Sequence, residues 1–222
     1  TFGKHGHMGY LDKRFGLVYG HLIFLAPASL PEINRITVSF RLPEGWGVVA
    51  PWKRQGDIFV IDIRDDPYGM NPLEPLGRAT IGLGSFTMCQ EKVRNFNIKV
   101  YNFAGWSDEH KKIICENIFW LARYQLDLFG VDASWDYMAV FVPNGKDGQR
   151  IFGGSSAWGQ GFEMEKIRTR QYELFSHRLH HALNAYDPLG YSMEDPATGW
   201  FIEGTASYYE IKALASREFY PI

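Results

Sequence analysis

Cysteine is scarce in this 222-residue sequence, and both strong net charge and long apolar runs are lacking. The two cysteines, Cys89 and Cys115, fit no zinc-site spacing, and we expect two buried free thiols, with a disulfide as the alternative. The formal net charge of −2 offers no bulk attraction for nucleic acid or an anionic membrane surface, so neither partner is expected. Without an apolar run of about 18 residues, no membrane span is expected.

Apolar and aromatic residues are plentiful, at 45% and 16% of the chain. The length suits one large domain or two modest ones, and this composition can fill a substantial core. The chain begins with Thr1, and no signal peptide is visible. A processed product would begin in this way, and for such a product a location outside the cytoplasm is slightly favoured.

Residues 1–104 are predicted to form a β-rich, sandwich-like domain. The segment 36–42, I-T-V-S-F-R-L, alternates apolar and polar side chains, which is typical of a strand with one exposed face. The Pro- and Gly-rich residues 65–77 predict a long loop. Further strands are predicted at residues 17–25, 47–51, 57–63, 79–86 and 96–103.

Residues 105–222 are predicted to form a second domain of helices and strands, so the expected fold class is α+β. Ser107 is an expected helix N-cap, and the acidic residues after it favour a first helical turn. A mostly apolar stripe that includes Gln125 then continues to about Gly130. A buried strand is predicted at 137–142, and two more helices at about 167–185 and 201–215, with a loop between them.

A possible metal site lies in these last two helices. His177 and His181 are four residues apart, which places both imidazoles on the same face of a helix. Two imidazoles held in this way can bind one zinc ion. Glu203, on the following helix, could complete three protein ligands and leave a fourth position open.

The segment around Glu203 carries a family resemblance. Residues 200–209 read W-F-I-E-G-T-A-S-Y-Y, and together with the His-x-x-x-His pair they resemble the gluzincin zinc peptidases. The likeness is strongest to the glycyl aminopeptidase family and next to the M1-type aminopeptidases. A weaker likeness to the N-terminal β domain of glycyl aminopeptidases lies in F-L-A-P and in I-T-V-S-F-R-L-P-E-G-W. The resemblance implies zinc as cofactor and a thermolysin-like catalytic domain in residues 105–222, which we expect to be truncated.

Arg178 departs from the family pattern. The family has glutamate directly after the first histidine, where it serves as general base for the attacking water. Arginine cannot accept a proton at any accessible pH, and it adds a positive charge beside the metal. Two orientations are open. The guanidinium points away from the metal, or it pairs with Glu203 or Glu173 and competes with zinc for a carboxylate.

Three further side chains are candidates for supporting roles. His180 could replace the missing base, although an exposed or supporting histidine is the commoner case. Glu173, one turn before His177, could act as base or fourth ligand, or form a surface salt bridge. Glu210 lies seven residues after Glu203 on the same helix face and could orient a ligand histidine through a hydrogen bond, or could be a solvated helix carboxylate.

The family also has an edge strand whose glutamate holds the substrate's amino group. The matching stretch here contains Gly153, Gly154, Ser155 and Ser156, and no acid stands at the expected position. The two glycines could let a peptide backbone lie against the strand, or could simply form a turn.

Three hypotheses for function follow. The first is a zinc-peptidase homologue with a degenerate H-R-x-x-H…E site, catalytically impaired, which binds a peptide or protein in the former active-site cleft. The second is an active metal-dependent peptide hydrolase that uses His180 or Glu173 as a displaced base. The third is a structural domain without a site.

Overall fold

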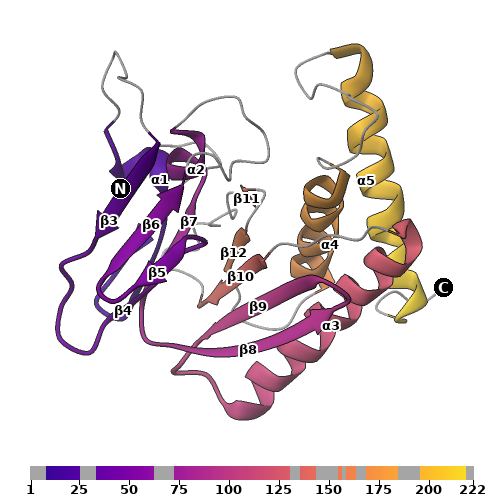
Figure 1. The fold of residues 1–222 in the computed structure, drawn as a ribbon. Coiled ribbons are helices and arrows are strands. Elements are labelled where there is room, and N and C mark those ends of the chain that lie inside the picture. Colours follow the sequence, from indigo (N-terminus) through magenta and orange to yellow (C-terminus); the bar gives the residue numbers. More distant parts are fainter. Residues whose placement is uncertain are drawn as a thin grey trace.

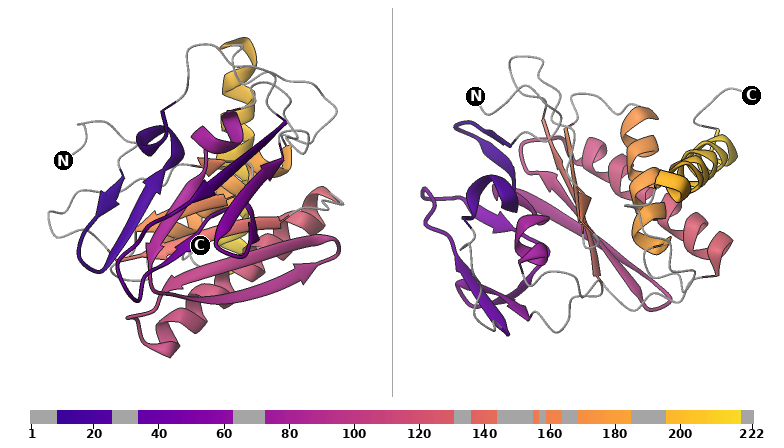
Figure 2. Two further views of the ribbon diagram at one scale, coloured as in Figure 1. Left: turned by 60° about the vertical axis from the view of Figure 1, so that its left-hand side comes forward. Right: turned by 90° about the horizontal axis from the view of Figure 1, so that it is seen from above.

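The computed structural model describes residues 9–25, 34–62, 73–130, 136–143, 155–156, 159–163, 169–184 and 196–218. The N-terminal strands form one side of the molecule, a five-stranded sheet crosses the middle, and the three long helices cover its other side (Figure 1). The view from above shows the same order of layers (Figure 2). Strands and helices thus coexist in the chain, and the predicted α+β class is confirmed.

Two small antiparallel sheets build the N-terminal side. The first has the order β1-β2-β7-β4 and the second β3-β6-β5. Their strands are β1 (Tyr10–Leu11), β2 (Phe15–Tyr19), β3 (Arg35–Ser39), β4 (Gly47–Val49), β5 (Lys53–Gln55), β6 (Ile58–Asp62) and β7 (Thr80–Gly84). The short helix α1 (Gly20–Ile23) follows β2, and α2 (Glu74–Gly77) precedes β7.

The strand predicted at residues 17–25 is confirmed for residues 17–19 and wrong for the remainder. It ends at Tyr19, and α1 begins at Gly20. Gly20 lies so close to α2 that a Cβ atom there would be 1.6 Å from the carbonyl oxygen of Leu76. Its N–H donates to the carbonyl of Ala79 at 2.9 Å. The strand therefore ends at Gly20, where only a residue without a side chain fits against α2. The β-favouring residues around it gave no indication of this contact.

The central sheet has the order β11-β12-β10-β9-β8. Its members are β8 (Phe86–Val93), β9 (Phe96–Phe103), β10 (Asp136–Val142), β11 (Ser155–Ser156) and β12 (Gly159–Glu163). The middle strands β9, β10 and β12 are parallel, whereas β8 and β11 pair antiparallel at the two edges. Strands from both sides of residue 104 share this sheet, and the domain boundary expected there stays a prediction.

Three helices complete the fold: α3 (Asp108–Phe129), α4 (Thr169–Asn184) and α5 (Pro196–Ser216). The Ser107 hydroxyl accepts a hydrogen bond from the N–H of His110 at 3.2 Å, and Gly130 ends α3 in the left-handed conformation. Helix α5 begins at Pro196, inside the segment predicted as loop, and proline is favoured at a first helical position. No helix in the described ranges is both long and apolar enough to span a membrane.

The central sheet buries a different core on each face. On β9 and β10, Ile98, Val100 and Ala139 face the helices, and they pack with the apolar stripes of α3 and α4. The alternate residues Met138 and Val140 face the N-terminal strands and pack against β2 and β4. Because successive side chains of a strand point to opposite faces, the central sheet contributes to both cores.

Cys89 of β8 and Cys115 of α3 form a disulfide. The expectation of two free thiols was therefore wrong. Cys89 lies opposite Val100 in the β8–β9 ladder, and Val100 and Cys115 belong to the same core. The pairing depends on this strand register and on the way α3 crosses the sheet, neither of which is contained in the spacing of two cysteines.

Candidate metal centre

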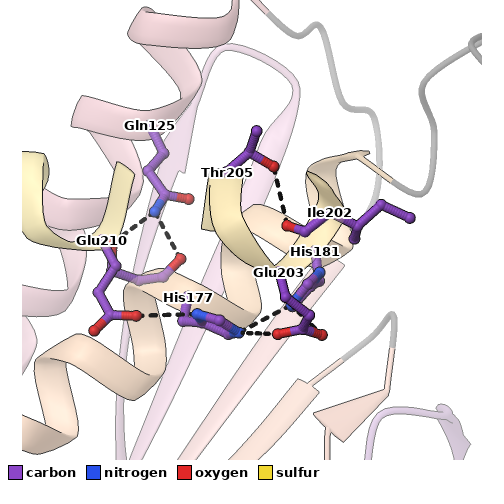
Figure 3. A network of polar contacts seen from close by, with 8 residues as sticks. Gln125, His177, His181, Ile202, Glu203, Thr205 and Glu210 are labelled. Atoms are coloured by element: carbon purple, nitrogen blue, oxygen red, sulfur yellow. Dashed lines mark hydrogen bonds and ion pairs between the residues drawn. The ribbon is translucent and has the colours of Figure 1, made fainter. Parts of the chain in front are cut away.

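Helix α4 is placed by its apolar stripe. Tyr172, Phe175, Leu179 and Leu183 recur at three- and four-residue steps, are almost fully buried, and pack into the core beneath the sheet. The residues between them are turned toward α5, which packs against α4. This is the face that carries the two histidines of the predicted pair (Figure 3).

Two buried polar contacts fix α4 against α3. The Asn117 side-chain amide donates to the Tyr172 hydroxyl at 3.0 Å. The Gln125 amide donates to both the carbonyl oxygen of Ser176, at 2.7 Å, and its hydroxyl, at 2.6 Å. Buried polar groups of this kind specify one arrangement, because any shift of the helix leaves them unsatisfied. Gln125 thereby holds the residue directly before His177.

Two imidazoles and one carboxylate meet between α4 and α5. The Nε2 atoms of His177 and His181 are 3.0 Å apart. Glu203 places Oε2 3.1 Å from Nε2 of His177 and Oε1 3.4 Å from Nε2 of His181. Within the described ranges these three residues are the group whose ligand atoms could hold a metal ion.

Glu210 lies behind His177. Its Oε2 is 3.0 Å from Nδ1 of His177, on the far side of the ring from Glu203 (Figure 3). A carboxylate only accepts hydrogen bonds, so Nδ1 carries the proton and donates. The lone pair of the neutral ring is then on Nε2, which faces the cluster. This orienting contact is the one predicted for Glu210 from its seven-residue spacing.

The centre of the cluster could hold a cation. In a neutral His177 oriented by Glu210, the Nε2 lone pair points at a carboxylate oxygen and at the second imidazole. Burial, which outweighs the opposing attraction of Glu203, lowers the pKa of His181 to about 4, with the charges of His177 and Arg178 acting in the same direction. His181 is therefore neutral near pH 7. The facing lone pairs can be satisfied by a metal ion, or by the ring proton of neutral His181 when that proton lies on Nε2.

The donor set fits zinc. Two histidines and one glutamate are a common three-ligand set for this metal, with Zn–N bonds of about 2.0–2.1 Å. Ligand atoms around a tetrahedral ion with such bonds are about 3.3 Å apart. The two Nε2 atoms are 3.0 Å apart, and each lies near one of the two Glu203 oxygens, Oε2 at 3.1 Å from His177 and Oε1 at 3.4 Å from His181. His181 differs from His177 in one respect: its Nδ1 is buried and has no hydrogen-bond partner in the described part of the chain.

Arg178 occupies the next position on α4 and is partly exposed. Its guanidinium makes no hydrogen bond or ion pair with any residue of the described ranges, so neither of the pairings considered for it, with Glu203 or with Glu173, is present. Glu203 instead contacts both histidines. The positive charge of Arg178 acts on the cluster through space, by lowering the pKa of His181.

His180 does not join the cluster. Its side chain is 1% exposed, and its ring stacks on Tyr209 of α5 and meets Phe129 of α3 edge to face. Burial, together with the neighbouring histidines, lowers its pKa to about 4. Glu173 is likewise outside the group of ligand atoms that converge. Neither residue is among the converging ligand atoms, and a role as displaced base stays a prediction for both.

The predicted substrate strand is described only in part. Ser155 and Ser156 form β11, an edge strand of the central sheet that pairs antiparallel with β12. Gly153 and Gly154 lie outside the described residues. The backbone placement agrees with the edge strand that the family resemblance implies, and the role of these residues stays a prediction.

Comparison with known proteins places the fold. It is similar to that of an aminopeptidase. The match is to the crystal structure of an aminopeptidase N family protein from Idiomarina loihiensis, with a TM-score of 0.68 and 16% sequence identity. The alignment covers 96% of this chain and 39% of that protein. No family model and no curated protein matches the sequence.

A likeness at 16% identity shows the fold alone. The cluster of histidines and carboxylates is described from the residues of this chain. Sequence reasoning missed Gln125 and Asn117 as anchors of α4. A signal was present, because Gln125 is a polar residue in a stripe of apolar ones, and such a residue needs a buried partner.

Proposed function

We propose that this chain is a distant relative of the gluzincin aminopeptidases that has kept the metal centre and lost hydrolysis, and that it binds peptide or protein segments. The observation that supports it is a set of convergent metal-ligand atoms with a guanidinium in the position of the general base. The C-terminal half is then a thermolysin-like domain.

His177, His181 and Glu203 would hold a zinc ion, and Glu210 would keep His177 in the ligating orientation. A bound zinc ion supplies Lewis-acid chemistry and would polarise a carbonyl group. Arg178 cannot take a proton from water. The loss of a general base typically lowers a rate by a factor of about 10² to 10⁴, which leaves binding as the function that this donor set still supports.

A peptide is the ligand class that the surroundings favour. The edge strand β11 can accept an extended chain by strand addition, in which backbone hydrogen bonds supply affinity. The Arg178 guanidinium, without an ion-pair partner in the described ranges, can bind a peptide carboxylate by paired hydrogen bonds. Both features suit recognition of a peptide segment, and neither needs the reaction.

Zinc binding tests the metal centre. The purified chain, freed of metal by a chelator and titrated with zinc, is expected to bind one ion, and His177→Ala is expected to abolish that binding. His21→Asn is the matched control, because His21 is an exposed histidine remote from the cluster. A chain that binds no zinc, or one in which His21→Asn loses as much affinity as His177→Ala, would contradict the proposal.

Hydrolysis of a fluorogenic peptide tests the loss of activity. The zinc-loaded chain is expected to show no turnover, and Arg178→Glu to gain it, by a factor of about 10² or more over Arg178→Gln. Binding of fluorescein-labelled casein peptides, followed by anisotropy, should be present in the unaltered protein and weakened in His177→Ala. Turnover by the unaltered chain at the rate of Arg178→Glu would overturn the claim of impairment.

A further inference from the structure

A second concave site lies on the other face of the central sheet. A cavity of about 620 Å³ lies between β4 and β5 on one side and the middle of β9 and the first residues of β10 on the other. Lys99, Tyr101 and Met138 line it from the central sheet, on the face that packs against the N-terminal strands. The histidine cluster is on the helices that cover the opposite face, so the cavity is a separate site.

The opposite wall carries an arginine on an unusual face. Arg54 of β5 pairs with Phe59 of β6, and Phe59 belongs to the buried inner face of its sheet. Paired residues share a face, so Arg54 projects from the same side as Phe59 and lies over its ring, 5.9 Å from the centroid. Both residues line the cavity. Arg54 is exposed, so water solvates its guanidinium while no anion is bound.

The charges around the cavity do not balance. Asp136, the acid in its lining, is already bound, because Lys99 forms an ion pair with it and the Asn97 side-chain amide donates to it at 3.1 Å. Arg54 donates through Nε to the carbonyl of Gly56 at 3.0 Å. Its terminal nitrogens, and the ammonium of Lys53, meet no acceptor among the described residues. Lys53 alternates with Arg54 along β5 and projects from the other face, so Arg54 is the cation that this wall presents without an anion among the described residues.

We propose that this cavity binds a small carboxylate with an apolar or aromatic body, and that Arg54 holds the carboxylate. The volume lies within the range of ligand pockets, about 300–1,000 Å³, and such pockets favour the boundary between packed layers. Val48, Val49, Trp52 and Met138 supply an apolar floor. The planar guanidinium matches a carboxylate by two parallel hydrogen bonds.

The lining favours a carboxylate over a phosphate. Every lining residue belongs to a strand or to the turn between β4 and β5. Among the described residues, no helix N-terminus, which commonly binds phosphate through its free N–H groups, is part of the wall. Burial raises the pKa of Tyr101, which therefore stays protonated and can donate a further hydrogen bond to an anion.

Calorimetric titration with indole-3-acetate tests the site. We expect saturable binding to the unaltered chain, at least tenfold weaker binding of the neutral indole-3-acetamide, and a loss of at least tenfold in Arg54→Gln. Arg41→Gln, which changes an exposed arginine outside the lining, should bind as the unaltered chain does. His177→Ala should also bind normally, which separates this site from the metal centre.

Three results would overturn the proposal. The first is no saturable binding at about 10 mM probe, a concentration that would reveal even a Kd in the millimolar range. The second is equal affinity for the acid and the amide, which would remove the role of charge. The third is undiminished binding by Arg54→Gln with an unchanged unfolding midpoint, which would place the probe elsewhere.

Discussion

Replacement of Glu210 by alanine should weaken zinc binding without touching a ligand atom. The Glu210 carboxylate accepts the Nδ1 proton of His177 at 3.0 Å, and the side chain is only 18% exposed. Without it, the ring of His177 is free to rotate and to carry its proton on Nε2, the atom that faces the metal position. Both changes have to be reversed before zinc can bind.

The size of the effect follows from the surroundings. Loss of a hydrogen-bond partner of a ligand histidine typically costs a factor of 10–100 in metal affinity, which is about 1.4–2.7 kcal/mol. Here His181 has no acceptor at its own Nδ1 within the described residues, so Glu210 orients the one ligand imidazole that is held in this way. Little water screens the contact. We therefore expect the upper part of that range, about 30- to 100-fold.

The assay is a zinc titration in competition with a fluorescent chelator. Glu210→Gln should lose less than Glu210→Ala, because an amide oxygen can still accept the Nδ1 proton without the charge. Glu116→Ala is the control, since Glu116 is an exposed carboxylate on α3 that is paired only loosely with Lys112, at 3.7 Å. Affinity of Glu210→Ala equal to that of the unaltered chain would refute the reasoning.

Three stability predictions can be checked by urea unfolding. Gln125→Leu leaves the buried carbonyl and hydroxyl of Ser176 without their donor and should lower the free energy of unfolding by about 2–3 kcal/mol; an unchanged midpoint would contradict this. Serine at both Cys89 and Cys115 opens a loop closed across 26 residues, worth about 3.5 kcal/mol in the chain-entropy account, and reductant should then have no further effect. Burial tends to raise the pKa of Asp12, but hydrogen bonds from its neighbours outweigh it and the net pKa is lowered. The stabilisation by Asp12 is therefore complete above about pH 3.9 and disappears as the pH falls through the folded pKa, so Asp12→Asn should be less acid-sensitive than the unaltered chain.

Helical spacing made the candidate site predictable. His177 and His181 are four residues apart, and Glu203 and Glu210 are seven apart, so each pair had to share a helix face once the helices formed. No long-range information was needed for that. The meeting of the two helices was inferred from the family resemblance, and the structure brings the four side chains together between α4 and α5.

The elements that could not be predicted from the sequence depend on contacts between distant segments of the chain. The polar strand β5 and the glycine-containing strand β12 have no apolar alternation, and both form because a neighbouring strand is present to pair with them. The disulfide depends on register in the same way. His180 was misjudged for a related reason, because only the packing of Phe129 and Tyr209 around it decides that it is buried.

Strand β10 is seven residues long and serves two neighbourhoods in alternation. Met138 belongs to the core on the N-terminal side of the sheet, while Tyr137 and Ala139 belong to the core under the helices. Substitutions scanned along it should sort into two interleaved classes, one that alters small-molecule uptake and one that disturbs the helical layer. Neighbouring residues of β10 pack into different cores. Substitutions on the two faces of this strand can therefore accumulate at different rates, although both faces belong to the same backbone.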